Sequence, residues 1–324
     1  MEKLFKNKKV LAHAMLIFVI FVWGSSPPLN VVMNKDYSVA FRSAVISLIS
    51  AVTLLLICIK KLKNLNKDYF KYAIPTGIFV SVASLVQKIG LLYTTPTKYA
   101  FLENISCVVV PIILFFAIKK KPSFLTIVSS VLCLVGMFIL SGMNFGAESI
   151  SFGKGELLCA LAGVLYGVNI AYTGVKIKKF NTLLYLLLQQ WASTIVSLLS
   201  AMLLSVIKVN GAPIEAIKFS FDLGGIALLV VLALVSNVLC WFLRTYAMKF
   251  VNPTAVSIIM PFSAVITGAI SLLVGMDTLS FEFACGGIIA LFAVILSSIA
   301  DVKEDKKEAE KKVLVADDLK EENG

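Results

Sequence analysis

Long apolar runs constrain this chain more than any other feature of its sequence. An α-helix needs about 20 mostly apolar residues to cross the hydrocarbon core of a bilayer. We predict ten such helices, at 10–32, 38–59, 72–93, 98–118, 123–143, 156–175, 181–207, 223–247, 250–274 and 280–300. The runs are solid and do not alternate with polar residues, which excludes a membrane β-barrel. The predicted fold class is therefore an all-α integral membrane protein with ten transmembrane helices.

The composition excludes soluble classes of protein. Apolar residues make up 59% of the 324 residues and charged residues 15%, whereas soluble domains average about 45–50% and about 25%. A net charge of +11 would suggest nucleic acid as the partner of a soluble protein. Here the positive charges cluster between apolar runs, so we expect membrane lipids and no nucleic acid.

The lysines predict how the chain is oriented in the membrane. Before the tail, sixteen lysines lie in the N-terminal segment and in the connections after even-numbered spans, against five in the other connections. Cytoplasmic loops carry the excess of positive charge. We therefore expect a multi-pass protein of the cell (plasma or inner) membrane with both termini in the cytoplasm. The first run has no small-residue cleavage pattern, so we expect it to be retained as a helix.

The two halves of the sequence echo each other. Residues 23–26 read WGSS in the first span, and residues 166–169 read YGVN in the sixth. Residues 90–111 and 244–261 each place a short polar turn with a proline between two spans. Five spans per half is an odd number, so the halves must be inverted relative to each other. Inverted repeats place a binding site near the midplane and allow alternating access.

These repeats define the predicted domains. We expect a first five-helix repeat at 10–143, a second at 155–300 and a charged cytoplasmic tail at 301–324. The tail either continues the last helix into water or is disordered.

Several segments resemble a known family. The run LVQKIGLLYTTPTKYAFLENISCVVVPIIL (85–114) is similar to the signature of the EamA-like branch of the drug/metabolite transporter superfamily. So are the WGSS motif, Phe41-Arg42 in the second span, and CWFLRTYAMK (240–249) in the eighth. The resemblance implies two inverted five-helix repeats and transport of a metabolite. It also implies a central cavity lined by the first four helices of each repeat, with the fifth helices outside.

Three charged residues lie within predicted spans at a similar depth. Arg42, Lys88 and Glu103 each sit about 6–8 Å below the outer surface at 1.5 Å per residue. A charge at a helix centre costs about 2.5–3.5 kcal/mol on insertion scales, so such residues need a cavity or a partner. We hypothesise that Glu103 pairs with one cation and leaves the other to bind a carboxylate. Two alternatives remain: a closed cluster that only fixes helix packing, and a role for Glu103 in carrying a coupling proton.

Uncharged polar residues lie deeper in both repeats. Such groups either bridge helices or face a wet cavity, and their presence in both repeats favours contact with substrate. The candidates are Trp23, Ser25, Ser26, Asn169, Gln189, Gln190, Asn237 and Trp241. Arg244, one turn from the inner end of its span, is expected to snorkel to the interface, with an inner gate contact as the alternative. Prolines are expected to interrupt three spans, at Pro27, Pro28, Pro111 and Pro261.

The expected function is secondary active transport by alternating access. The substrate would be a small polar metabolite, amino-acid-like or carboxylate-bearing, with a proton or a counter-substrate as the coupled species. The alternatives are a membrane-embedded lipid-handling enzyme and a non-transporting receptor. With one histidine, His13, and six cysteines in apolar runs without CxxC spacing, we expect no metal, no cofactor and no enzymatic activity.

Overall fold

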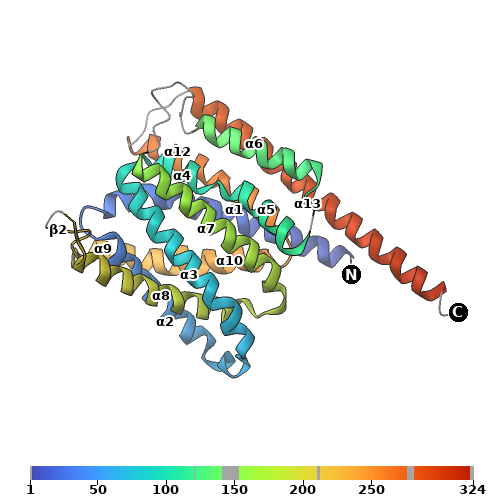
Figure 1. Ribbon diagram of the computed structural model, residues 1–324, viewed down its shortest axis with the longest axis horizontal. Helices are drawn as coiled ribbons and strands as arrows, with labels where there is room; N and C mark the ends of the chain where they lie inside the picture. Colours follow the sequence, from blue (N-terminus) through green and yellow to red (C-terminus); the bar gives the residue numbers. More distant parts are fainter. Residues whose placement is uncertain (1, 120, 141–152, 210–211, 276–280, 322–324) are drawn as a thin grey trace.

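The computed structural model describes residues 2–119, 121–140, 153–209, 212–275 and 281–321 as a bundle of helices (Figure 1). The α-helices are α1 (Glu2–Met33), α2 (Val39–Cys58), α3 (Lys67–Gly90), α4 (Pro96–Glu103), α5 (Ser106–Ile118), α6 (Phe124–Leu140), α7 (Lys154–Lys176), α8 (Thr182–Val206), α9 (Leu223–Val231), α10 (Cys240–Ala247), α11 (Pro253–Ile259), α12 (Ser263–Leu273) and α13 (Phe281–Glu321). Shorter elements are the 3-10 helices η1 (Ile59–Asn64), η2 (Leu91–Tyr93), η3 (Ile177–Lys179) and η5 (Met260–Phe262), the π-helix η4 (Leu232–Leu239), and the strands β1 (Lys208–Val209) and β2 (Ala212–Pro213).

These elements form the predicted ten spans. Within the described residues, eight helical spans are long and apolar enough to cross a membrane, and the shorter apolar helices α5 and α6 supply the other two. The prediction of an all-α ten-helix fold is confirmed. The antiparallel hairpin of β1 and β2, between α8 and α9, is a small addition that was not predicted. The end of the fifth predicted span, 141–143, and residue 280 lie outside the described residues.

Two spans are broken at equivalent places in the two repeats. The fourth span consists of α4 and α5, separated by a turn at Asn104 and Ile105. The ninth consists of α11 and α12, separated by η5. A glycine packs closely against the residue that follows each break. A Cβ atom added at Gly24 would lie 2.8 Å from Ser263 O, and one added at Gly167 would lie 3.5 Å from Ser106 Cα. Ser106 and Ser263 each begin the helix after the break, so the WGSS and YGVN segments pack alike.

The prolines differ from the prediction in two spans. α1 runs through Pro27 and Pro28 without a break. Pro28 leaves the Gly24 carbonyl without its helical donor, and the Thr267 hydroxyl of α12 donates to that carbonyl over 2.8 Å. Pro111 lies inside the continuous helix α5, so the break in the fourth span precedes it. Only Pro261 lies at a break, in η5.

The packing of the spans follows the duplication. α6 packs on α13, so the fifth span of one repeat contacts the fifth span of the other. α2 packs on α8, so the second spans of the two repeats also contact each other. α3 packs on α7, and α1 packs on α10; these two pairs exchange when the repeats are exchanged. The contacts of α1 with α12 and of α4 and α5 with α7 exchange in the same way. The bundle is therefore built around a pseudo-two-fold axis between inverted repeats.

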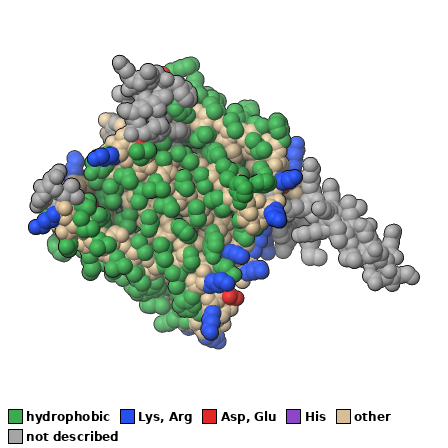
Figure 2. All heavy atoms as spheres, viewed as in Figure 1, with side chains coloured by type: hydrophobic (Ala, Val, Ile, Leu, Met, Phe, Trp, Pro, Cys, Tyr) green, Lys and Arg blue, Asp and Glu red, His purple; other side chains and the backbone are tan. Residues whose placement is uncertain are grey.

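The surface of the bundle is suited to lipid. Figure 2 shows hydrophobic side chains over the middle of the visible face, with lysines toward its two ends. Both termini lie at the same end of the bundle (Figure 1), as an even number of spans requires. α13 continues to Glu321, so the tail extends the last helix, the first of the two predicted alternatives.

Candidate functional site

A polar cavity of about 160 Å³ lies between the two repeats. Its wall comes from spans 1–4 of the first repeat and the first four spans of the second, with no described residue of α6 or α13, as the family resemblance implies. Its polar lining residues are Trp23, Ser26, Asn30, Ser43, Ser47, Ser81, Ser84, Gln87, Lys88, Tyr99, Glu103, Asn104, Ser106, Tyr166, Gln190, Ser193, Ser197, Ser236, Asn237, Trp241, Arg244, Ser263 and Thr267. We call this space the central cavity.

Seven of the predicted site residues line the central cavity. They are Trp23, Ser26, Lys88, Glu103, Gln190, Asn237 and Trp241. They come from five spans and from both repeats. The structure thus brings together side chains that are up to 218 residues apart in sequence, from Trp23 to Trp241.

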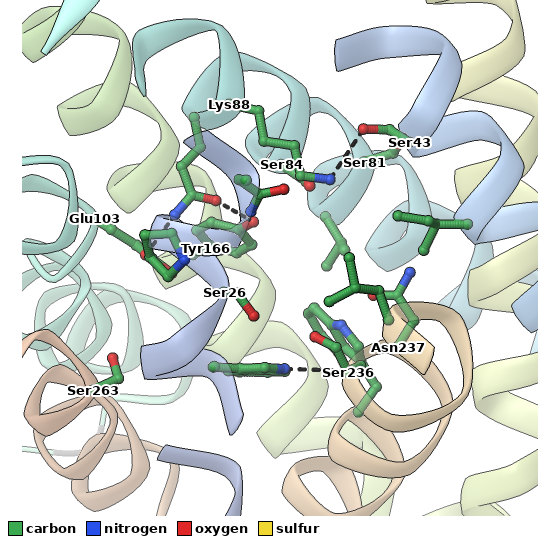
Figure 3. A pocket seen from close by; sticks show the side chains of 18 of the residues that line it. Ser26, Ser43, Ser81, Ser84, Lys88, Glu103, Tyr166, Ser236, Asn237 and Ser263 are labelled. Atoms are coloured by element: carbon green, nitrogen blue, oxygen red, sulfur yellow. Dashed lines mark hydrogen bonds between the residues drawn. The ribbon is translucent and has the colours of Figure 1, made fainter. Parts of the chain in front are cut away.

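Lys88 and Glu103 face the cavity from different directions. The Lys88 ammonium donates to the Ser43 hydroxyl of α2 over 3.0 Å. The Glu103 carboxylate, at the end of α4, accepts a hydrogen bond from the Gln87 amide of α3. Figure 3 shows Lys88 extending toward Ser43, with Glu103 on the other side of the view near Tyr166. The hypothesised ion pair of Glu103 with a cation is therefore not formed within the part of the chain that the structure describes.

The other four predicted site residues do not line the cavity. Ser25 donates to the Val22 carbonyl of its own helix over 2.7 Å. Gln189 accepts from Thr76 of α3 over 3.4 Å and so bridges α8 to α3. Asn169 donates to the Thr76 carbonyl over 3.2 Å and accepts from Arg244 over 3.5 Å. Gln189 and Asn169 therefore bridge helices, one of the two roles that such depth allows, whereas Ser25 bonds within its own helix.

Arg42, the fourth, is fully buried behind the cavity wall. Its guanidinium donates to the Asn34 side-chain oxygen over 3.0 Å and to the Asn30 carbonyl over 3.5 Å. Glu215, from the segment after β2, accepts hydrogen bonds from the first amides of α2, at Val39 and Ala40. A carboxylate thus caps α2 one turn before Arg42, where it also counters the charge of Arg42.

Arg244 lies in the cavity, so the prediction that it snorkels to the interface was wrong. Its side chain is 2% exposed. The guanidinium carbon lies 4.7 Å from the ring centroid of Trp241 and 5.7 Å from that of Trp23. The two rings are themselves 5.3 Å apart. Cation–π contacts of this kind are strongest where water is excluded, and they hold the guanidinium at the cavity wall.

The π-helix η4 presents backbone carbonyls to neighbouring spans. Trp23 donates through its indole nitrogen to the Ser236 carbonyl over 3.2 Å, and Gln190 donates to the Asn237 carbonyl over 3.5 Å. The Ser50 hydroxyl donates to the Ala233 carbonyl over 3.1 Å. π segments occur often at functional sites. This one joins α1, α2 and α8 to the cavity wall. No residue type in the sequence predicts the π segment.

Serines form much of the lining and were not predicted. They are Ser43, Ser47, Ser81, Ser84, Ser106, Ser193, Ser197, Ser236 and Ser263. A signal was present, because positions three, four or seven apart share one face of a helix. Ser81, Ser84 and Lys88 follow that spacing in α3, and Gln190, Ser193 and Ser197 follow it in α8.

An aromatic cluster joins the beginnings of α3 and α8. Phe180 is within 4.8 Å of Tyr69 and 5.9 Å of Tyr185, measured between ring centroids. The Tyr185 hydroxyl donates to the Tyr72 carbonyl over 3.0 Å. These four residues belong to or pack against the largest hydrophobic core of the described chain, and none of them lines the cavity.

The fold and this site define a class of protein: a multi-pass membrane transporter. Residues 10–142 and 153–299 each match the EamA-like transporter family. Together these stretches cover most of the chain, and the protein belongs to that family, within the drug/metabolite transporter superfamily. Transport and not enzymatic conversion is the activity that membership implies.

Two known proteins are similar to this chain, one in sequence and one in fold. A protein of Archaeoglobus fulgidus described as an uncharacterized transporter is 23% identical over 293 residues, which cover 90% of this chain and 87% of that protein. A solved crystal structure of another protein aligns with a TM-score of 0.70 at 12% identity, over 90% of this chain and 98% of the other. The second likeness shows a shared fold.

Proposed function

We propose that the chain is a secondary active transporter that moves a small polar, carboxylate-bearing metabolite across the cell membrane by alternating access. The observation that carries this proposal is the central cavity, whose wall holds Lys88, Glu103 and Arg244 without an ion pair. Charges persist inside a membrane protein where they face a cavity, a partner or a substrate. A cavity of about 160 Å³ is below the range of roughly 300–1,000 Å³ that is usual for drug-sized ligands, which favours a small substrate.

The inverted repeats supply the mechanism. If each repeat can adopt the conformation that the other has now, the cavity would open first to one face of the membrane and then to the other. The aromatic cluster around Phe180 supports closure at the end with the termini. We therefore infer that the central cavity opens toward the opposite end of the bundle in this conformer. The lysine distribution supports a cytoplasmic location for both termini, so this conformer would be the outward-facing one.

Flux measured in proteoliposomes tests the proposal. Purified protein is reconstituted, the vesicles are loaded with a mixture of unlabelled metabolites, and entry of labelled carboxylates and amino acids is followed by counterflow. We expect one chemical group of labelled compounds to accumulate, and Arg244→Met to abolish that accumulation. If no compound enters faster than into protein-free vesicles, while a candidate ligand still binds, the chain is a receptor and not a transporter.

A further inference from the structure

We infer that the substrate is an acidic amino acid, with two carboxylates and one amino group. Arg244 and Lys88 would bind the carboxylates, and Glu103 would bind the ammonium. This inference rests on the proposed transport function and names the substrate class of the same cavity. The argument is one of charge complementarity, built from the three charged residues that line the cavity.

Arg244 has unused hydrogen-bonding capacity. A guanidinium carries five N–H donors in a planar fork. One Nη donates to Asn169 over 3.5 Å, and Nε has no partner although it is buried. Trp23 and Trp241 fix the plane of the group and offer it no acceptor. The other Nη has no hydrogen bond to a described residue. This planar, oriented guanidinium therefore matches a carboxylate, which an arginine can bind through two parallel hydrogen bonds.

Lys88 is a second cation with capacity to spare. Its ammonium has three donors, and its one hydrogen bond goes to the neutral Ser43 hydroxyl. Ser43 lies in the second turn of α2, toward the end of the bundle opposite the termini, whereas Trp23 places Arg244 near the middle of the first span. The two cations therefore sit at different depths, which suits one elongated molecule with two acidic groups.

Glu103 supplies the only carboxylate on the described cavity wall. It accepts one hydrogen bond, from the neutral amide of Gln87, and a carboxylate offers about four lone-pair sites. A substrate ammonium would use the remaining sites. Arg42 does not enter this balance, because it lies behind the wall and is bonded to Asn30 and Asn34.

The charges of the wall then sum to plus one, and the complementary substrate carries minus one. Two carboxylates and one ammonium give that charge, and each would meet an opposite charge in the cavity. A neutral amino acid would leave one cation without a partner, and a dicarboxylate without an amine would leave Glu103 without one. Leaving a buried charge unpaired is strongly unfavourable.

Competition in proteoliposomes tests this assignment on the full chain. Entry of labelled L-aspartate and L-glutamate is measured against unlabelled L-asparagine, L-glutamine, succinate and glutarate. We expect the acidic amino acids to enter, and each competitor to be weaker by about tenfold or more, since each lacks one charged contact.

Two variants should each remove the selectivity for a different charged group of the substrate. Lys88→Met removes one carboxylate contact and is expected to reduce the preference for aspartate over asparagine to near one. Glu103→Gln removes the ammonium contact and is expected to make succinate compete as well as aspartate. Lys35→Met, at an exposed lysine between α1 and α2, is the matched control and should leave all ratios unchanged.

The outcomes separate this inference from the proposed function. If a neutral compound is transported and acidic amino acids neither enter nor compete, the substrate assignment is wrong while the transporter proposal stands. Unchanged selectivity in folded Lys88→Met and Glu103→Gln, judged by size-exclusion profile, would also overturn the assignment. If no compound enters at all, the transporter proposal fails first.

Discussion

The two arginines of the chain, Arg42 and Arg244, occupy contrasting surroundings. Both are buried within spans, at 0% and 2% exposure. Arg42 meets the oxygens of Asn30 and Asn34, with the Glu215 carboxylate one turn away. Arg244 meets two tryptophan rings and one distant amide oxygen, and it lines the cavity. Burial of a charge therefore does not by itself identify a binding residue. We propose Arg244 for substrate binding, and not Arg42, because Arg244 lines the cavity and has no close polar partner.

Replacing Arg244 by Met is expected to have the largest effect. Flux should fall about 100-fold, because two charge-assisted hydrogen bonds to the substrate are lost. Thermal stability in detergent should change little, because the loss of the contacts with Trp23 and Trp241 is offset by removal of the desolvation penalty of a buried charge. Arg244→Lys should also be impaired, because an ammonium cannot form the planar two-bond contact. Flux within threefold of the parent protein would place Arg244 among structural residues.

Replacing Arg42 by Met should lower the stability of the protein and leave its flux nearly unchanged. Loss of its donors leaves the Asn34 side-chain oxygen without its partner, whereas the Asn30 carbonyl keeps the hydrogen bond from the Asn34 backbone amide. We expect the free energy of unfolding to fall by about 1–3 kcal/mol. Flux per folded molecule should stay within about threefold. Thermal melting and flux are measured on the same preparation. A folded, stable variant that has lost transport would show that Arg42 serves the substrate directly.

Trp241→Leu removes the ring nearest the guanidinium of Arg244. A desolvated cation–π contact contributes about 2 kcal/mol, so KM should rise by about tenfold or more as the guanidinium loses its orientation. Kinetics of counterflow give KM and maximal rate separately. A change confined to the maximal rate would assign Trp241 to the conformational step and not to substrate binding.

Trp23→Phe is expected to have the smallest effect of the four. The ring stays beside Arg244, while the hydrogen bond to the Ser236 carbonyl is lost. Interhelical hydrogen bonds in membranes contribute about 0.6 kcal/mol on average, which corresponds to about threefold in affinity or rate. Trp23→Leu, which removes the ring as well, should be clearly worse. Equal losses in the two variants would argue against a role for the ring.

The spans could be predicted from the sequence because lipid demands long apolar helices. Their interruptions could not. The turn at Asn104 and the π segment at Leu232–Leu239 depend on contacts with other helices, such as the indole of Trp23 with Ser236. Proline marked only one of the breaks, at Pro261, because neighbouring side chains can satisfy the carbonyls that proline frees.

The site could be predicted in part, because sequence position gives depth but not the face of a helix. Gln189 and Gln190 lie at nearly one depth, yet only Gln190 lines the cavity, since neighbours on a helix point about 100° apart. For Arg244, the distance from the end of the span indicates the interface, whereas the helical face indicates the cavity. Its spacing of seven and three residues from Asn237 and Trp241 puts all three on one face.

Thiol labelling from each side of the membrane tests alternating access through the central cavity. In a background without the native cysteines, Ser84→Cys places one thiol on the cavity wall, and Leu56→Cys, at a 67% exposed apolar position, places one toward lipid as a control. Right-side-out and inside-out vesicles are treated with a membrane-impermeant thiol reagent. We expect Ser84→Cys to be labelled from both sides and to be protected by transported substrate, and Leu56→Cys to be labelled from neither side. Labelling of Ser84→Cys from one side only, unaffected by substrate, would contradict alternating access through this cavity.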